Sequence, residues 1–257
     1  MQAKLKDYIW IDLQRAFGNR KIFLGVFGVC IVFLYNNYMP DSAIGWVSEI
    51  TSISALSMAA FLFASYPYAT AFCEDREYRY DMQMTLRGNS FSYACARLIV
   101  VFLSSLFTML MGFFLATLFI CLKYGLISQS AIDNISSGHG HYYQLAVQGD
   151  YALYILCAGL QIGSLAGALA VIGLTCSLFV RNRMLVYILP VALLYVEDIL
   201  VQRLLGWEVG SIFSLRSMGI ATLQFTVKGQ SWQLYYFEIF MILLCCGAIV
   251  CWKTGRR

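Results

Sequence analysis

The stretch Tyr151–Val180 reads YALYILCAGLQIGSLAGALAVIGLTCSLFV and contains no charged residue. About 20 apolar residues of helix cross the hydrocarbon core of a bilayer, so this stretch is long enough to span a membrane. The whole chain has the same character: 60% of its 257 residues are hydrophobic and 12% are charged. Soluble domains carry about 25% charged residues. The composition therefore excludes a soluble enzyme, a DNA-binding domain and a disordered chain, and it predicts an integral membrane protein.

Apolar runs on both sides of this stretch predict further membrane spans. They are Ile22–Tyr38, Thr51–Phe72, Leu98–Leu122, Met184–Val196 and Trp232–Trp252. With the N-terminus inside, 14 of the 18 Lys and Arg residues fall on the cytoplasmic side, which is the bias that orients membrane proteins. We therefore expect an all-α polytopic protein with six transmembrane helices in the inner or plasma membrane of a cell, with both termini cytoplasmic.

Residues 1–21, before the first span, have the pattern of an amphipathic helix. One arc of the helical wheel is apolar and the opposite arc carries charge, which favours a helix lying in the inner membrane interface over a disordered tail. The apolar arc consists of Leu5, Ile9, Trp10, Leu13, Ala16 and Phe17, and the polar arc of Lys4, Asp7, Gln14 and Arg15.

The fifth apolar run is short for a span. Met184–Val196 contains Pro190 and is followed by Glu197 and Asp198, and two carboxylates in lipid would be costly. We expect the helix to end in a polar cavity or the chain to turn back, with residues 197–231 forming an outer re-entrant region. The alternative is a helix that continues to about Leu205 with its carboxylates facing protein.

Two other motifs have simple interpretations. Gly159, Gly163 and Gly167 recur every fourth residue and allow a second helix to approach closely; packing within the chain is the favoured interpretation. His139 and His141 are the only histidines, and a His-x-His pair can bind a metal. A solvated loop is favoured there. We expect neither a metal site nor a catalytic residue, because no catalytic motif is present, so another chain would have to supply the energy for any work.

The second cytoplasmic loop, residues 74–93, is more elaborate than a connector requires. The second span runs directly into Glu74, Asp75, Arg76 and Glu77. A short helix through Met84 and Leu86 follows, Gly88–Ser90 interrupts it, and a new helix begins toward Arg97. Mixed charge and a defined turn are typical of a docking element.

This loop and the overall topology resemble the permease subunits of type-2 ABC exporters. In that family an acidic pair ends the second span, a short coupling helix and a turn with Gly or Pro and Ser follow, and a basic residue opens the third span. The chain departs from the family at Arg79-Tyr80, where many members carry Gly-Thr, and so matches the drug-exporter branch less well. The resemblance implies one transmembrane domain over residues 1–257 and two copies of an ATPase subunit that hold ATP and Mg. It also implies a second copy of the permease, and contact with the ATPase through Glu74, Asp75, Arg76, Glu77, Met84, Leu86 and Arg87.

The resemblance also places the first, second and fifth spans around a substrate cavity. The residues expected there are Met58, Phe61, Tyr66, Tyr187 and Tyr195. Met and aromatic side chains suit amphipathic or hydrophobic cargo, so we expect export of amphipathic peptides, as by bacteriocin or phenol-soluble-modulin exporters, with no nucleic-acid partner. The alternatives are a drug or lipid exporter, and a non-transporting membrane sensor or assembly protein. A membrane enzyme is a third choice.

Overall fold

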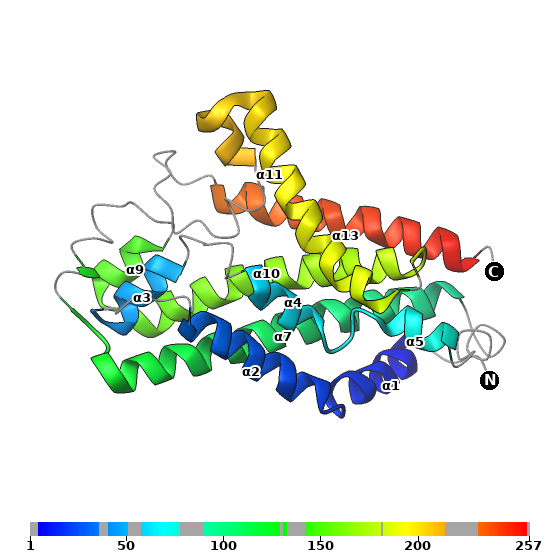
Figure 1. The fold of residues 1–257 in the computed structure, drawn as a ribbon, viewed down its shortest axis with the longest axis horizontal. Helices are drawn as coiled ribbons and strands as arrows, with labels where there is room; N and C mark the ends of the chain where they lie inside the picture. The colour runs from blue at the N-terminus through cyan, green and yellow to red at the C-terminus, as the bar shows by residue number, and fades with distance from the viewer. Residues whose placement is uncertain are drawn as a thin grey trace.

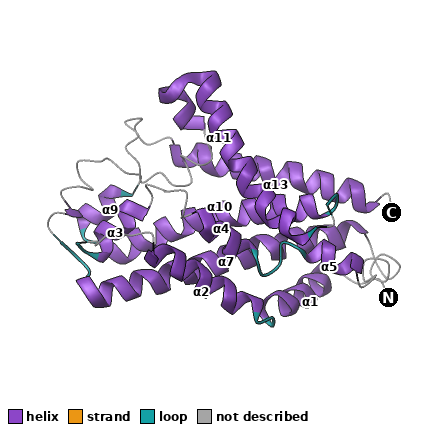
Figure 2. Cartoon of the chain, in the orientation of Figure 1, coloured by secondary structure: helices purple, strands orange, loops and turns teal. Residues whose placement is uncertain are grey.

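The computed structural model describes residues 5–35, 41–50, 58–77, 90–128, 131–132, 142–180, 182–213 and 231–255. All regular secondary structure in these ranges is helical, as Figure 2 shows. The helices, in chain order, are α1 (Leu5–Phe17), α2 (Lys21–Tyr35), α3 (Ala43–Ile50), α4 (Met58–Ser65), α5 (Ala71–Glu77), α7 (Ser90–Tyr124), α9 (Tyr143–Gln148), α10 (Tyr151–Ser177), α11 (Arg183–Phe213) and α13 (Ser231–Gly255).

The helices run back and forth along one long axis (Figure 1). Helices α1 and α5 and the end of α13 lie at one end of the molecule, and α3 and α9 lie at the other. We call the first of these the α1 end.

Among the described residues, four segments are long and apolar enough to cross a membrane: Phe91–Tyr124, Tyr151–Ser177, Arg183–Leu204 and Tyr235–Thr254. Helices α1 and α2 pass the same test together, with a bend of 59° between them, which gives up to five spans. The described part of the molecule is thus helical, as predicted, and its long apolar helices are compatible with a membrane protein, with four or five candidate spans where six were expected.

Helix α10 forms the centre of the bundle and packs against α7 along its length. The glycine stripe makes this packing possible: a Cβ atom at Gly167 would lie 2.7 Å from the ring of Phe102, and one at Gly159 would lie 3.0 Å from the ring of Phe113. The stripe therefore serves packing within the chain, and its close contacts are with α7.

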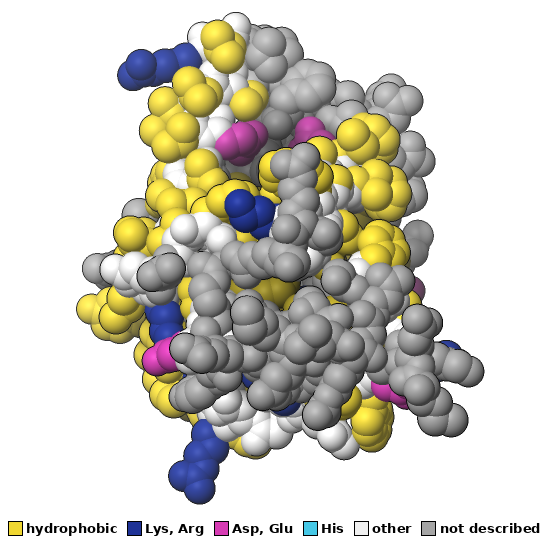
Figure 3. All heavy atoms as spheres, turned by 90° about the vertical axis from the view of Figure 1, so that its right-hand side faces the viewer, with side chains coloured by type: hydrophobic (Ala, Val, Ile, Leu, Met, Phe, Trp, Pro, Cys, Tyr) yellow, Lys and Arg dark blue, Asp and Glu magenta, His cyan; other side chains and the backbone are white. Residues whose placement is uncertain are grey.

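The outer surfaces of the helices are apolar. On α2, Phe23, Phe27 and Ile31 are each about 60% exposed, at 64%, 59% and 64%. Viewed onto the α1 end (Figure 3), hydrophobic side chains cover much of the coloured flanks, and charged side chains stand singly among them. Such a surface suits contact with lipid and not with water.

The second predicted span is not one helix. Within Thr51–Phe72 the structure describes α4, then a turn over residues 66–70, then the start of α5. Pro67 explains the break, because proline lacks an N–H group and disfavours helical geometry at the preceding residue. The described part of this predicted span, residues 58–72, is therefore not one continuous helix.

The fifth predicted span is longer than expected. Helix α11 continues through Pro190 and past Glu197 and Asp198 to Phe213, so the alternative of a helix reaching about Leu205 is the closer description. Glu197 is half-buried on this helix. Residues 214–230 of the expected re-entrant region lie outside the described residues. His139 and His141 also lie outside them.

The N-terminal helix forms as predicted, but its buried face is different. Tyr8, Asp12 and Ala16 are the buried residues of α1, whereas Trp10 of the predicted apolar arc is 64% exposed. Ile9, Leu13 and Phe17 pack against a core cluster that includes Phe72 and Tyr93. The helix thus turns a carboxylate toward the bundle and leaves a tryptophan on the surface.

Two glycine-to-alanine substitutions should separate tight from loose helix contacts. A Cβ atom at Gly112 of α7 would lie 2.5 Å from Cγ1 of Val29 and 3.0 Å from the carbonyl oxygen of Val26, whereas the nearest atom at Gly163 is 3.4 Å away. Gly112→Ala should cost about 1–3 kcal/mol, the usual cost of overpacking. Gly163→Ala should be neutral or stabilising, because alanine favours helix. Thermal unfolding of the detergent-solubilised protein checks this; equal midpoints for both variants would contradict the α2–α7 packing.

Candidate functional site

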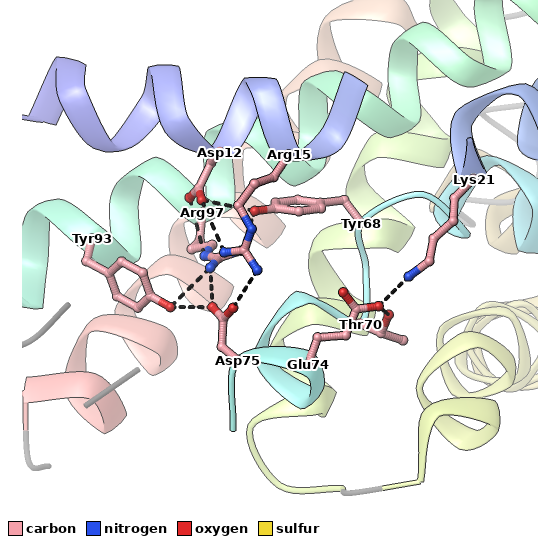
Figure 4. Close-up of polar contacts among 9 residues, drawn as sticks. All are labelled: Asp12, Arg15, Lys21, Tyr68, Thr70, Glu74, Asp75, Tyr93 and Arg97. Atoms are coloured by element: carbon pink, nitrogen blue, oxygen red, sulfur yellow. Dashed lines mark hydrogen bonds and ion pairs between the residues drawn. The ribbon is translucent and has the colours of Figure 1, made fainter. Parts of the chain in front are cut away.

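The acidic residues of the second loop lie on α5 and at its end, and each carboxylate meets a different part of the molecule (Figure 4). Asp75 points toward α1 and α7, and Glu74 points toward Lys21 at the start of α2. Glu77 pairs with Arg183 at the start of α11. Helix α5 is thus joined by ion pairs to four other helices.

Arg97 of α7 is the centre of the buried part of this site. Its side chain has no exposed surface, although it carries a full charge. It ion-pairs with Asp75 through Nη2, and its Nε lies 3.3 Å from Oδ2 of Asp12. The two carboxylates are themselves 0% and 3% exposed. One arginine therefore holds α1 and α5 to α7 from inside the protein.

Two tyrosines add hydrogen bonds around Arg97, although Nε of Arg97 and Oδ2 of Asp12 meet only as an ion pair. The Tyr68 hydroxyl donates to Oδ1 of Asp12 at 3.0 Å and accepts a bond from Nη1 of Arg97. The Tyr93 hydroxyl donates to Oδ2 of Asp75 at 2.6 Å. Both rings also lie 5.2 Å from the guanidinium carbon, a distance at which the ring faces attract a cation.

Arg15 balances the charge of the site. It donates to Oδ1 of Asp75 at 3.0 Å and lies 4.0 Å from Oδ1 of Asp12. The site then contains two carboxylates and two guanidinium groups, which gives it no net charge. A buried ion pair is tolerated when its members are matched and hydrogen-bonded in this way. We call Asp12, Arg15, Tyr68, Asp75, Tyr93 and Arg97 the buried network.

A second, more exposed branch leads from Glu74 to α11. Lys21 pairs with Oε1 of Glu74, and the Thr70 hydroxyl donates to the same oxygen at 3.3 Å. Thr70 Oγ1 also lies 3.1 Å from the Tyr187 hydroxyl. At the surface, Arg183 and Glu77 complete the connection, with side chains 46% and 58% exposed.

The residues predicted to contact an ATPase differ in position. Glu74 is partly buried and Glu77 is exposed, whereas Asp75 is fully enclosed by the chain. A carboxylate without exposed surface does not form a docking contact, so Asp75 instead fixes α5 in place. Arg76 is part of α5; Met84, Leu86 and Arg87 lie outside the described residues.

The residues predicted to line a cavity also separate into two groups. Met58 and Phe61 are 3% and 1% exposed and belong to a core cluster that also contains Trp46 and Phe113, so both side chains are enclosed by the chain. Tyr66 and Tyr187 face each other with ring centroids 5.6 Å apart, and Tyr66 is 36% exposed. Tyr195 packs against the core and is half-buried. Met58 and Phe61 thus pack inside the single chain, and a cavity role for the five residues stays a prediction.

Three members of the buried network, Asp12, Tyr68 and Tyr93, were not predicted. Arg15 was placed on the polar arc of the helix, and its contact with Asp75 was not predicted. One signal was available for α1. Tyr8, Asp12 and Ala16 are spaced by four residues and so share a helix face, which places Asp12 between two residues suited to burial. The partners across the bundle carry no such local signal.

No protein-family model, no curated protein and no solved structure matches this chain. The geometry of the site is therefore the basis for a functional proposal.

Amide substitutions on α5 should distinguish its buried carboxylate from its exposed one. Asp75→Asn leaves Arg97 with a weakened counter-charge and should cost about 3–5 kcal/mol, as expected for breaking a buried pair. The control Glu77→Gln makes the same chemical change at the surface and should cost about 0–1 kcal/mol. Thermal unfolding and the yield of folded protein measure both. A similar loss in the two variants would mean that Asp75 is not held as described.

Proposed function

We propose that this chain is the membrane subunit of an ATP-driven exporter of the type-2 ABC class. The observation that carries the proposal is the position of α5, which is joined by ion pairs to α1, α2, α7 and α11 at the α1 end. The segment that follows α5 is the loop whose sequence resembles a coupling element. A force applied to that segment would reach several helices together, as the coupling of a membrane subunit to an ATPase requires.

The proposed assembly contains two copies of this chain and two ATPase subunits, which bind ATP and Mg. Closure of the ATPase dimer would move α5 and the loop after it, and the two permease halves would rock between inward and outward access. The helices alternate in direction, as the proposed topology with cytoplasmic termini requires: α2, α7 and α11 run away from the α1 end, and α4, α10 and α13 run back toward it. The α1 end would then face the cytoplasm.

The proposed cargo is an amphipathic or hydrophobic peptide. Tyr66 and Tyr187 form an adjacent aromatic pair at the α1 end, and their polar tips and apolar rings suit such a ligand. Apolar burial contributes about 25 cal/mol per Å² before entropic costs. Affinity would therefore depend on a continuous apolar face and little on sequence.

Thiol labelling tests the proposed topology. A single cysteine introduced beside His139 should react with a membrane-impermeant maleimide on intact cells, whereas one beside Arg87 or Arg256 should react only after the membrane is opened. Labelling is counted over the parent chain, whose own cysteines provide the background. Reaction of the Arg87 position from outside would overturn the six-span arrangement and the exporter proposal with it.

ATP hydrolysis tests the function and the cargo together. The chain is purified from its native membrane with any bound ATPase and reconstituted, and hydrolysis is measured with a synthetic leucine–lysine peptide of helical periodicity. This peptide should stimulate hydrolysis, and a scrambled peptide of equal composition should stimulate it much less. Equal stimulation by both, or by a lipid or drug alone, would remove the peptide cargo. Absence of a bound ATPase would remove the exporter.

A further inference from the structure

Helix α11 is the least enclosed of the long helices. Only 18% of its most apolar stretch is buried, compared with 72% for α10 and 44% for α7. Figure 1 shows it leaving the bundle as it rises from the α1 end. Side chains of residues 66–77 contact its first turns, and these contacts do not involve the buried network.

Residues 66–77 contact the start of α11 through an exposed ion pair and through hydrogen bonds of the half-buried Tyr187, one of them to the buried Thr70. Arg183 pairs with Glu77. The Tyr187 hydroxyl lies 3.1 Å from Thr70 Oγ1 and donates to the carbonyl oxygen of Tyr66 at 3.2 Å. We call the pairs Arg183–Glu77 and Tyr187–Thr70 the latch. An exposed ion pair contributes little to stability, whereas breaking a buried pair is costly, so the latch can open while the buried network stays intact.

Pro190 provides a point about which these first turns can move. Proline has no N–H group, so the carbonyl of Val186 lacks its usual partner within the helix. That carbonyl instead faces Gly173 of α10, where a Cβ atom would lie 3.2 Å from the oxygen and 3.3 Å from Cγ of Pro190. Beyond the proline, Val191 and Leu194 pack on the core. On the C-terminal side of Pro190 the helix is thus anchored on the core, and on the N-terminal side its contacts include the latch and the fully buried Val186.

We propose that residues 183–189 form a cytoplasmic gate, held closed by the latch and pivoting at Pro190. This proposal rests on the function proposed above and specifies its regulation. Helix α5 stays with α1 and α7 through Asp75, so movement of α5 carries Glu77 and Thr70 away from α11. Separation would part the rings of Tyr66 and Tyr187 and admit cargo between them. The isolated chain, as in this structure, is then in the closed state, and binding of the nucleotide-free ATPase would open the gate.

Hydroxyl-radical footprinting of the full chain in lipid nanodiscs tests the latch directly. Tyr187 should oxidise about fivefold faster in Glu77→Arg and in Arg183→Glu, the change that loss of one exposed ion pair allows. The double swap Glu77→Arg with Arg183→Glu should restore the wild-type rate. Tyr93, in the buried network, reports general loosening and should keep its rate in every variant.

A pair of threonine variants provides a matched control for the second contact. Thr70→Val removes the hydroxyl beside Tyr187 and should raise Tyr187 oxidation. Thr117→Val removes a hydroxyl that bonds only to its own helix, at the Phe113 carbonyl, and should leave that oxidation unchanged. Unchanged Tyr187 oxidation in both single charge reversals, a parallel rise at Tyr93, or failure of the double swap would each overturn the gate.

The nucleotide response connects the gate to the exporter. In the complex with its ATPase, a non-hydrolysable ATP analogue should slow Tyr187 oxidation relative to nucleotide-free complex, and Glu77→Arg should abolish this difference. An unchanged rate in an ATPase complex that hydrolyses ATP would overturn the gate alone. If no ATPase binds, the exporter proposal fails, while footprinting of the isolated chain still decides whether the latch exists.

Discussion

The architecture at the α1 end depends on one buried guanidinium. Arg97 enters the core on α7, and a charge without exposed surface requires counter-charges at contact distance. Among the residues that the structure describes, α1 and α5 supply them, through Asp12 and Asp75. The N-terminal helix must therefore lie against α7, which accounts for its 59° bend away from α2. For the same reason, the turn after Pro67 must bring α5 close to α1 and α7. The positions of three helices follow from satisfying one side chain.

Sequence reasoning predicted what depends on local pattern and missed what depends on distant pairing. Apolar runs predicted the helical membrane character, and the periodicity of residues 5–17 predicted α1. Arg15 and Asp75 are 60 residues apart and Thr70 and Tyr187 are 117 apart, so no window along the chain reveals these pairs. Two differences between the expected and the observed helices have causes in the sequence. Pro67 divides the second span, and Gly173 leaves room for Pro190, which allows α11 to continue.

Helix α5 has a buried side and an exposed side, and the difference in energy between them gives the segment two roles. Asp75 belongs to a matched group of four charges and two tyrosines, where removal of one member leaves another charge buried. Glu77 faces solvent, where its ion pair is weak. A displacement of α5 would therefore carry α1 and α7 with it and part from α11. Under the proposed function, the segment would transmit movement to one group of helices and release another.

This distinction changes how the acidic cluster has to be interpreted. Adjacent carboxylates after an apolar run suggest one docking surface, and reversal of both charges is the obvious test of such a surface. Asp75, however, is enclosed by Arg15, Tyr93 and Arg97, so its reversal would place like charges in contact inside the protein and damage the fold. A loss of activity in that variant would identify no interface. Glu77 is the carboxylate of α5 whose exposure allows a partner to reach it without disturbing the core, and evidence for docking at this helix must come from there.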